Sequence, residues 1–254
     1  MFRGKVVSMI FQDALVALNP TVNIGTQIIE NLENHNSDKL SRTQMLQRAR
    51  EMLECVGIPD AGSRLRQYPH SLSGGMRQRV MIAAAIITHP ELLIADEATT
   101  ALDVTIQAQI ISLLQQLQKQ LGMGILMITH NLGIVAEIAD DILVMYAGKI
   151  VEHGNSSSIF YNPRHPYTWA LLHASPRPDT KRKQPLFVIE GAPPNMICPP
   201  EGCPFCARCP YAMQVCVRYE PPTVHLENNH TVSCWLTDPR ADSSGIPFRT
   251  GDVV

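Results

Sequence analysis

Two short apolar runs, each ending beside titratable side chains, constrain the fold of this chain more than any other feature. Leu92 to Ala95 is followed by Asp96 and Glu97, and Ile125 to Ile128 ends close to His130. Short apolar runs with polar ends are typical of buried parallel strands. In open α/β sheets, ligand chemistry lies at the carboxyl ends of the strands. The runs therefore predict a mainly parallel sheet with a polar site at one edge.

The residue types at this edge indicate metal and proton chemistry. Asp96 can hold Mg²⁺, directly or through its water, and Glu97 can take a proton from an attacking water. Each feature alone has a simpler interpretation. An acidic pair after a strand is common at a solvated helix N-terminus, and a lone histidine such as His130 is more often structural. It is the combination that favours a site.

A third motif lies between the opening strand and this edge. Ser73, Gly74 and Gly75 run into a helix-compatible segment from Met76 to Ile87. A helix N-terminus offers free N–H groups and a positive dipole end to a phosphate, and glycine permits close backbone approach. By itself the triplet is as common in a plain turn or linker.

The remaining periodicities predict alternating helices and strands up to about residue 160. We expect a strand over 6–11 ending at Gln12, helices over 26–56 with a polar break at 34–41, a long helix over 103–122, a short helix over 134–139, and a hairpin of 142–146 and 150–153 turned by 147–149. The chain has 254 residues and 45% hydrophobic content, which suit one or two domains with a buried core.

Charge and hydropathy exclude some classes of protein. The net charge of -2 gives no general attraction for nucleic acid. The sequence contains no apolar run of the roughly 18 to 20 residues that a membrane span needs, and its first residues do not form a secretory signal. We therefore expect a cytosolic chain.

Together the motifs resemble the ATP-binding subunits of ABC transporters. In family order, they correspond to a Q-loop, a signature motif, a Walker B strand, a D-loop and a switch histidine, here Phe11-Gln12-Asp13, Ser73-Gly74-Gly75-Met76, Leu92 to Glu97, Ala101-Leu102-Asp103 and His130. Five motifs in order over roughly 120 residues are highly specific. One departure is Ala98, where the family usually has proline after the glutamate.

The resemblance implies a role for each group and partners for the chain. Glu97 would polarise the attacking water, His130 would contact the γ-phosphate, Asp96 and Gln12 would serve Mg²⁺, and Asp103 would organise a dimer interface. The signature motif would close over ATP held by a second ABC ATP-binding subunit in a head-to-tail homodimer or heterodimer. Residues of about 20–88 would form the helical subdomain that touches the transmembrane permease subunits.

A P-loop of the form Gly-x-x-x-x-Gly-Lys-Ser/Thr is not present in the sequence. We therefore expect an N-terminally truncated ABC-type nucleotide-binding domain that begins after the family's P-loop, and weak ATP turnover by this chain alone. This leaves an alternative open. The chain would then be a non-catalytic remnant or metal-bearing adaptor that supplies only the signature motif to a partner ATPase.

The character of the chain changes beyond about residue 160. Fifteen of the 19 prolines lie from Pro163 onward. The stretch Asn162 to Thr168, which contains His165-Pro166-Tyr167, resembles the segment that closes the nucleotide domain in oligopeptide and dipeptide importers. We therefore expect an ABC ATPase domain over 1–160 and an irregular Cys/Pro-rich extension over 161–254.

The extension is rich in cysteine and resembles that of the same peptide importers, some of which hold a [4Fe-4S] cluster. The residues that match the family pattern are Cys203, Cys209, Cys216 and Cys234. Four thiolates are the ligand set of such a cluster. Zn²⁺ in a four-cysteine site is one alternative, since tetrahedral thiolate sites suit both metals, and a cluster of thiols without metal is the other. We expect a structural role for either metal.

The sequence thus predicts a peripheral subunit on the cytoplasmic side of the cell membrane that hydrolyses ATP to power peptide import. It would act with permease subunits, and indirectly with a peptide-binding protein. A soluble ABC-type ATPase of DNA repair is disfavoured because the sequence shows no basic patch.

Overall fold

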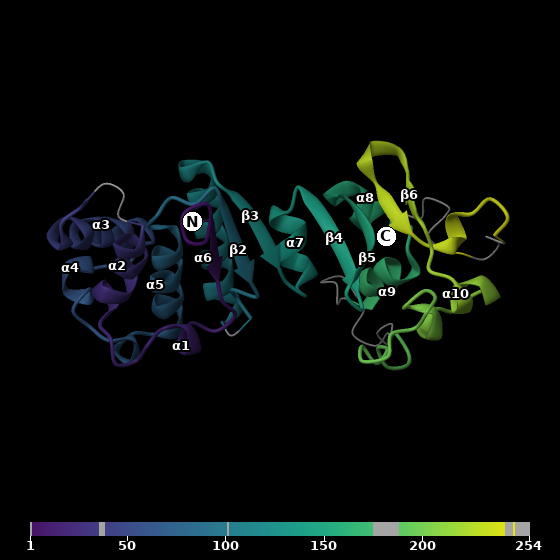
Figure 1. The fold of residues 1–254 in the computed structure, drawn as a ribbon, viewed down its shortest axis with the longest axis horizontal. Coiled ribbons are helices and arrows are strands. Elements are labelled where there is room, and N and C mark those ends of the chain that lie inside the picture. The colour runs from purple at the N-terminus through teal and green to yellow at the C-terminus, as the bar shows by residue number, and fades with distance from the viewer. Residues whose placement is uncertain (1, 36–38, 101, 175–187, 242–245, 247–254) are drawn as a thin grey trace. The chain divides into compact units, whose positions relative to one another are not determined.

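The computed structural model describes residues 2–35, 39–100, 102–174, 188–241 and 246. The chain divides into two compact units, residues 1–130 and 131–254, drawn in Figure 1 from purple to yellow. Among the helices of the described ranges, none is long and apolar enough to cross a bilayer. The expected domain boundary near residue 160 stays a prediction.

The first unit is a three-stranded parallel sheet with helices before and between its strands. Its elements are β1 (Val7–Ile10), α1 (Ala14–Ala17), α2 (Ile24–Asn34), α3 (Arg42–Cys55), α4 (Ala61–Arg64), α5 (Gly74–Ile86), β2 (Leu92–Asp96), α6 (Val104–Leu121) and β3 (Gly124–Ile128). The strand order is β1-β2-β3, and both pairs are parallel. The expected α/β class with a mainly parallel sheet is confirmed for this unit.

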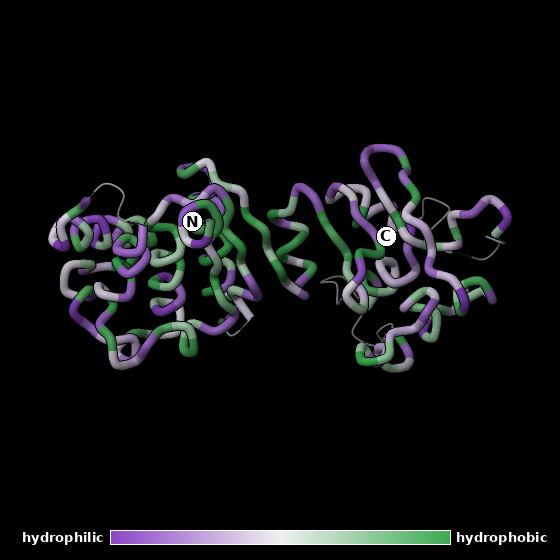
Figure 2. The backbone as a smooth tube through the Cα atoms, viewed as in Figure 1, coloured by the Kyte–Doolittle hydropathy of each residue, from purple (hydrophilic) through white to green (hydrophobic). Residues whose placement is uncertain are grey.

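One hydrophobic core joins the sheet to the helices of this unit. The central helix α5 packs against α1, α2, α3 and β1. Its side chains Val80, Ile82 and Ile86 are fully buried, as is Leu93 of β2. Figure 2 shows the hydrophobic stretches of the strands in green. Because the core fixes both the sheet and α5, it also fixes the ends of the strands and the start of that helix.

The second unit is built on an antiparallel sheet. Its elements are α7 (Leu132–Ile138), β4 (Asp141–Tyr146), β5 (Lys149–Asn155), α8 (Ser156–Tyr161), α9 (Pro166–Ala174), α10 (Gln214–Arg218), β6 (Thr223–His225) and β7 (Thr231–Ser233), with short 3₁₀ helices between some of them. The sheet order is β4-β5-β7-β6. The expected hairpin is β4–β5, but the extension, expected to be irregular, adds two strands to it. Strands of three residues carry too short a pattern to be recognised.

A buried carboxylate ties three segments of the second unit together. Glu152 of β5 is 1% exposed and accepts hydrogen bonds from the backbone N–H groups of Arg164 (2.5 Å) and His165 (3.0 Å). It also pairs with Nε2 of His230 at 2.8 Å. A buried carboxylate is stable only when its oxygens are satisfied in this way. Glu152 therefore holds the approach to α9 against the β6–β7 segment.

Removing the charge of Glu152 tests this arrangement. We expect Glu152→Gln to lower the free energy of unfolding of the second unit by about 3 kcal/mol, because an amide N–H₂ replaces one of the two buried acceptor oxygens and faces an N–H donor there. Urea unfolding followed by tryptophan fluorescence measures this, since both tryptophans, Trp169 and Trp235, lie in this unit.

The matched control for this prediction is Glu220→Gln. Glu220 pairs with Lys149 on the surface, where the two side chains are 52% and 47% exposed. Exposed ion pairs contribute only about 0 to 1 kcal/mol. Equal losses of stability in the two variants would contradict the role given to Glu152.

Candidate active site

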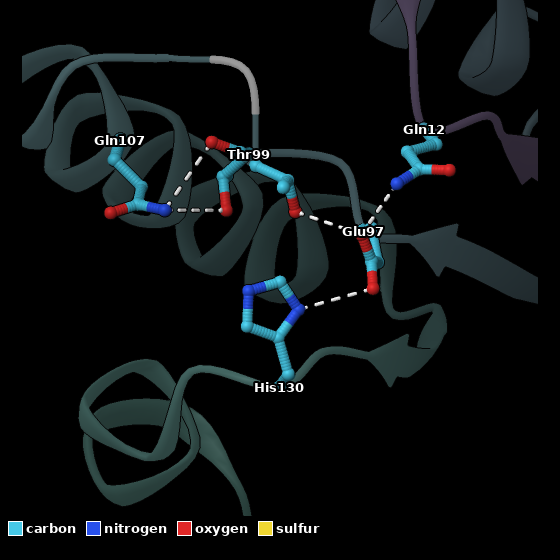
Figure 3. A network of polar contacts seen from close by, with 6 residues as sticks. Gln12, Glu97, Thr99, Gln107 and His130 are labelled. Carbon is cyan, nitrogen blue, oxygen red and sulfur yellow. Dashed lines mark hydrogen bonds and ion pairs between the residues drawn. The ribbon is translucent and has the colours of Figure 1, made fainter. Parts of the chain in front are cut away.

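Three segments meet at the carboxyl edge of the parallel sheet. Gln12 follows β1, Glu97 follows β2 and His130 follows β3. The register pairs Ile10 with Ala95 and Asp96 with Ile128, so the three strands end nearly level with one another. Figure 3 shows the side chains of Gln12 and His130 pointing toward the Glu97 carboxylate from opposite sides.

The Glu97 carboxylate is the centre of this group. Its Oε2 accepts hydrogen bonds from Nε2 of Gln12 (2.6 Å) and from Oγ1 of Thr100 (3.2 Å), and its Oε1 lies 3.1 Å from Nδ1 of His130. The hydrogen bond with His130 is the main cause that lowers the pKa of Glu97, and the bonds from Thr100 and Gln12 act in the same direction. Glu97 is therefore ionised at neutral pH.

The backbone at Glu97 forms a strained turn. Its φ of +44° lies in the left-handed region, which is uncommon for residues other than glycine. The turn is tied down on both sides, because the N–H of Glu97 donates to Ile128 O at 2.9 Å and the N–H of Thr100 donates to Glu97 O at 3.1 Å. This conformation directs the side chain out of the sheet edge toward His130.

Asp96 and Gln12 provide the oxygen atoms that suit a hard cation. Asp96 is the last residue of β2 and is half-buried. Within the part of the chain that the structure describes, its carboxylate accepts no hydrogen bond. The amide of Gln12 donates through nitrogen to Glu97, which leaves its oxygen as an acceptor. This donor set fits Mg²⁺, which is bound through carboxylate and amide oxygens.

The signature residues form an exposed helix N-terminus. Ser73 caps α5, since its Oγ accepts from the N–H of Met76 at 3.4 Å, and Gly74 is the first helical residue. A Cβ on Gly75 would lie 2.9 Å from Cγ2 of Ile106, so glycine permits the close approach of α6. Gly74 and Gln12 line the same small cavity, of about 80 Å³.

Asp103 has a local role that the sequence motif did not indicate. It is the N-cap of α6, and its Oδ1 accepts from the N–H of Ile106 at 2.9 Å. Asp103 is exposed, so its predicted place at a dimer interface stays a prediction. Ala101 of the predicted D-loop lies outside the described residues.

Sequence reasoning missed the polar residues that support Glu97. Thr100 binds its carboxylate, Gln107 of α6 binds Thr99, and Gln78 of α5 binds the carbonyl of Ala98. Nothing in the sequence singles them out, since Gln78 stands between Arg77 and Arg79 near the start of α5, and Gln107 lies one turn into α6 among other glutamines.

Comparison with known proteins identifies the kind of protein that carries this site. The ABC transporter family model matches residues 2–100, and the model of the oligopeptide/dipeptide transporter C-terminal region matches residues 151–216. The chain is 52% identical over 242 residues to the dipeptide transport ATP-binding protein DppD of Bacillus subtilis (strain 168), a match that covers 94% of this chain and 71% of the relative. This chain belongs to the peptide-transport ATP-binding proteins of the ABC transporter family.

Other relatives agree with this assignment. The oligopeptide transport ATP-binding protein OppD of the same strain is 51% identical over 239 residues, covering 94% of this chain and 66% of the relative. Among solved structures, the dimeric ATP-binding cassette MJ0796 has a TM-score of 0.53 at 24% identity and covers 60% of this chain and 64% of that chain. The cbiO1 protein of Clostridium perfringens has the same TM-score at 29% identity, covering 61% and 59%. These structures confirm the ABC ATPase fold.

The cysteine cluster of this peptide-transport ABC subunit lies in the second unit. Cys203, Cys216 and Cys234 are buried, and Cys209 is partly buried. Burial, together with the neighbouring thiols of the cluster, raises the pKa of Cys209 and Cys234 to about 12. The four thiols come from separate segments and lie close enough to interact electrostatically.

The backbone around this cluster is tightly packed. The N–H of Cys203 donates to Cys216 O at 2.8 Å, and a Cβ on Gly202 would lie 2.2 Å from the same oxygen. Only glycine fits there. The donor set suits iron-sulfur or zinc, but within the described residues no group of three or more His, Cys, Asp or Glu side chains is arranged as a metal site. Both metals therefore remain predictions.

The electrostatics of Glu97 give a measurable pKa. We expect the pKa of the Glu97 carboxyl to lie below the usual value for glutamate, and to rise in His130→Ala more than in Thr100→Val, because the bond with His130 is the larger cause. Carbon-13 NMR of glutamate-labelled protein measures this, with the Glu97 signal assigned by its loss in Glu97→Gln.

The lowered pKa of Glu97 also predicts how the stability of the folded state changes with pH. A carboxyl whose pKa is lowered on folding stabilises the folded state above its unfolded pKa, and that contribution is lost as the pH falls through the folded value. His130→Ala should therefore reduce the acid dependence of unfolding below about pH 4.5. An identical pKa in the parent and His130→Ala proteins would refute the contact.

Proposed function

We propose that this chain is an ATP-hydrolysing subunit that powers the import of oligopeptides or dipeptides through an ABC transporter. The observation that carries the proposal is the ionised Glu97 carboxylate, held by His130 and Gln12 at the ends of three parallel strands beside Asp96. The relatives DppD and OppD, named for dipeptide and oligopeptide transport, support the peptide substrate.

In this proposal Glu97 orients and polarises the water that attacks the γ-phosphate. An ionised carboxylate accepts a hydrogen bond from water and takes up positive charge as the water loses its proton. The lowered pKa of Glu97 keeps the group ionised, so its role is to hold the water in line. Asp96 and Gln12 would hold Mg²⁺, which supplies charge neutralisation to the phosphates when bound.

The bond between His130 and Glu97 constrains how the histidine contacts phosphate. If Nδ1–H donates to Glu97, the neutral ring has a lone pair at Nε2 and accepts there. A phosphate oxygen is also an acceptor, so Nε2 can donate to it only when the ring carries both protons. The His130 side chain is 70% exposed, so a ligand can reach it from solvent.

The signature motif would act on a second nucleotide site. Ser73, Gly74 and Gly75 lie at the exposed start of α5, a helix of 13 residues whose free N–H groups and dipole suit a phosphate. We infer that this end closes over ATP held by a second ABC ATP-binding subunit. The subunit would lie at the cytoplasmic side of the membrane, bound to permease subunits and served indirectly by a peptide-binding protein.

A chimera tests the hydrolytic role. We expect a chain in which the P-loop segment of a relative precedes this sequence to hydrolyse ATP, and Glu97→Gln to lower kcat by about 10² to 10⁴, the range for one positioned acid–base group. Phosphate release measures it. Turnover that is unchanged in Glu97→Gln would exclude this role for Glu97.

The second candidate is an adaptor that lends only its signature motif to a partner ATPase. It is favoured by the exposed start of α5. In that case the unmodified chain would stimulate a partner that carries a P-loop, Ser73→Arg would abolish the stimulation, and Glu97→Gln would leave it unchanged. Sensitivity to both substitutions supports the hydrolytic subunit.

We also infer that Cys203, Cys209, Cys216 and Cys234 hold a [4Fe-4S] cluster, with Zn²⁺ as the alternative. Anaerobically purified protein should contain about four iron and four sulfide per chain. Cys216→Ser should remove them, while Cys55→Ser, at an exposed cysteine of the other unit, should not. About one zinc per chain would establish the alternative, and metal-free protein would contradict both.

A further inference from the structure

Two glutamines from two helices bind the backbone of the turn that carries Glu97. Gln78 of α5 is 3% exposed, and its Nε2 donates to Ala98 O at 2.6 Å. Gln107 of α6 donates through Nε2 to both the carbonyl oxygen (3.3 Å) and Oγ1 (3.1 Å) of Thr99. Figure 3 shows Gln107 beside Thr99, with both of its contacts to that residue.

The turn depends on these donors because its residues are buried outside regular structure. Ala98 is 5% and Thr99 is 6% exposed. Buried carbonyl groups need a hydrogen-bond donor, and a turn that leaves the end of a strand has few backbone donors available. An apolar residue in place of Gln78 would leave the carbonyl of Ala98 without this donor in the core.

The positions of the two glutamines link the turn to functional helix ends. Gln78 lies five residues after Ser73 on the same helix, so it moves with the signature motif. Gln107 lies four residues after Asp103, which caps α6. The turn between them contains Glu97 in its left-handed conformation. A shift of either helix is therefore transmitted directly to the backbone beside Glu97.

We propose that Gln78 and Gln107 are positioning residues for hydrolysis, which hold the turn 97–100 so that Glu97 meets His130, and that Gln78 couples the signature helix to that turn. The proposal rests on the hydrolytic function proposed above. Neither glutamine contacts the reacting atoms. Each acts on Glu97 through the backbone carbonyl of a neighbouring residue.

The test compares Gln78→Met and Gln107→Met with Gln109→Met. Methionine keeps the length of glutamine and removes the amide. Gln109 lies on α6 with Gln107 but is exposed, so it controls for the loss of a glutamine from that helix. Because Gln78 is deeply buried and its variant can fail to fold, the half-buried Gln107 provides an independent variant.

The first readout is hydrogen exchange of the segment 97–100 in the chain itself. The N–H of Glu97 is hydrogen-bonded to Ile128 O, and the N–H of Thr100 is hydrogen-bonded to Glu97 O. We expect these two N–H groups to exchange about 10-fold faster in Gln78→Met and in Gln107→Met, and at the parent rate in Gln109→Met. Unchanged exchange in folded Gln78→Met and Gln107→Met proteins would overturn the proposal, whether or not ATP is hydrolysed.

The second readout is ATP turnover in the P-loop chimera. Misplacing a catalytic group by about 1 Å can cost on the order of 10²-fold, so we expect kcat to fall about 10- to 100-fold with KM unchanged. Loss of stability alone would leave kcat per folded molecule at the parent value, and that result would overturn the positioning role. An inactive parent chimera with fast exchange in the variants would instead count against the hydrolytic function alone.

Discussion

The candidate site depends on one constraint, which is that the three parallel strands of the first unit end nearly level with one another. It brings Gln12 to Glu97 across 85 positions of sequence and His130 to Glu97 across 33. Each of these side chains follows its strand within two residues, so strand register brings it to the shared sheet edge. A slip of one residue in the pairing of β2 would move the side chain of Asp96 to the other face of the sheet and displace Glu97 with it. The buried core of α5 and β2 opposes such a slip and so maintains the geometry of the candidate site.

The turn after β2 orients the Glu97 carboxylate at the end of its strand. Glu97 adopts a left-handed conformation, which costs free energy and persists only where neighbouring contacts enforce it. Those contacts come from β3 through Ile128 O and from α5 and α6 through the two glutamines. Ala98, where the family usually has proline, therefore still lies in a turn that is held by side-chain hydrogen bonds.

Periodicity predicted much of the first unit because its pattern is local. The strands over 92–95 and 125–128, and the long helix from residue 103, lie where their apolar spacing indicated. The sequence also pointed to Glu97 and His130 as neighbours at a sheet edge. It could not reveal Gln78, Gln107 or Thr100, because a single polar side chain that binds a backbone carbonyl or a carboxylate follows no repeating pattern in the sequence. For the same reason, the pairing of β5 with β7 was not foreseen, since that partner lies about 80 residues away.

The contacts of Glu97 also limit what the site can hold. An ionised carboxylate offers about four lone-pair sites to donors. Gln12, Thr100 and His130 occupy three of them in this structure, so a single site remains for one water. In the hydrolysis that we propose, the bonds that lower the pKa of Glu97, and so weaken it as a base, are the same bonds that leave it one acceptor site for a nucleophile.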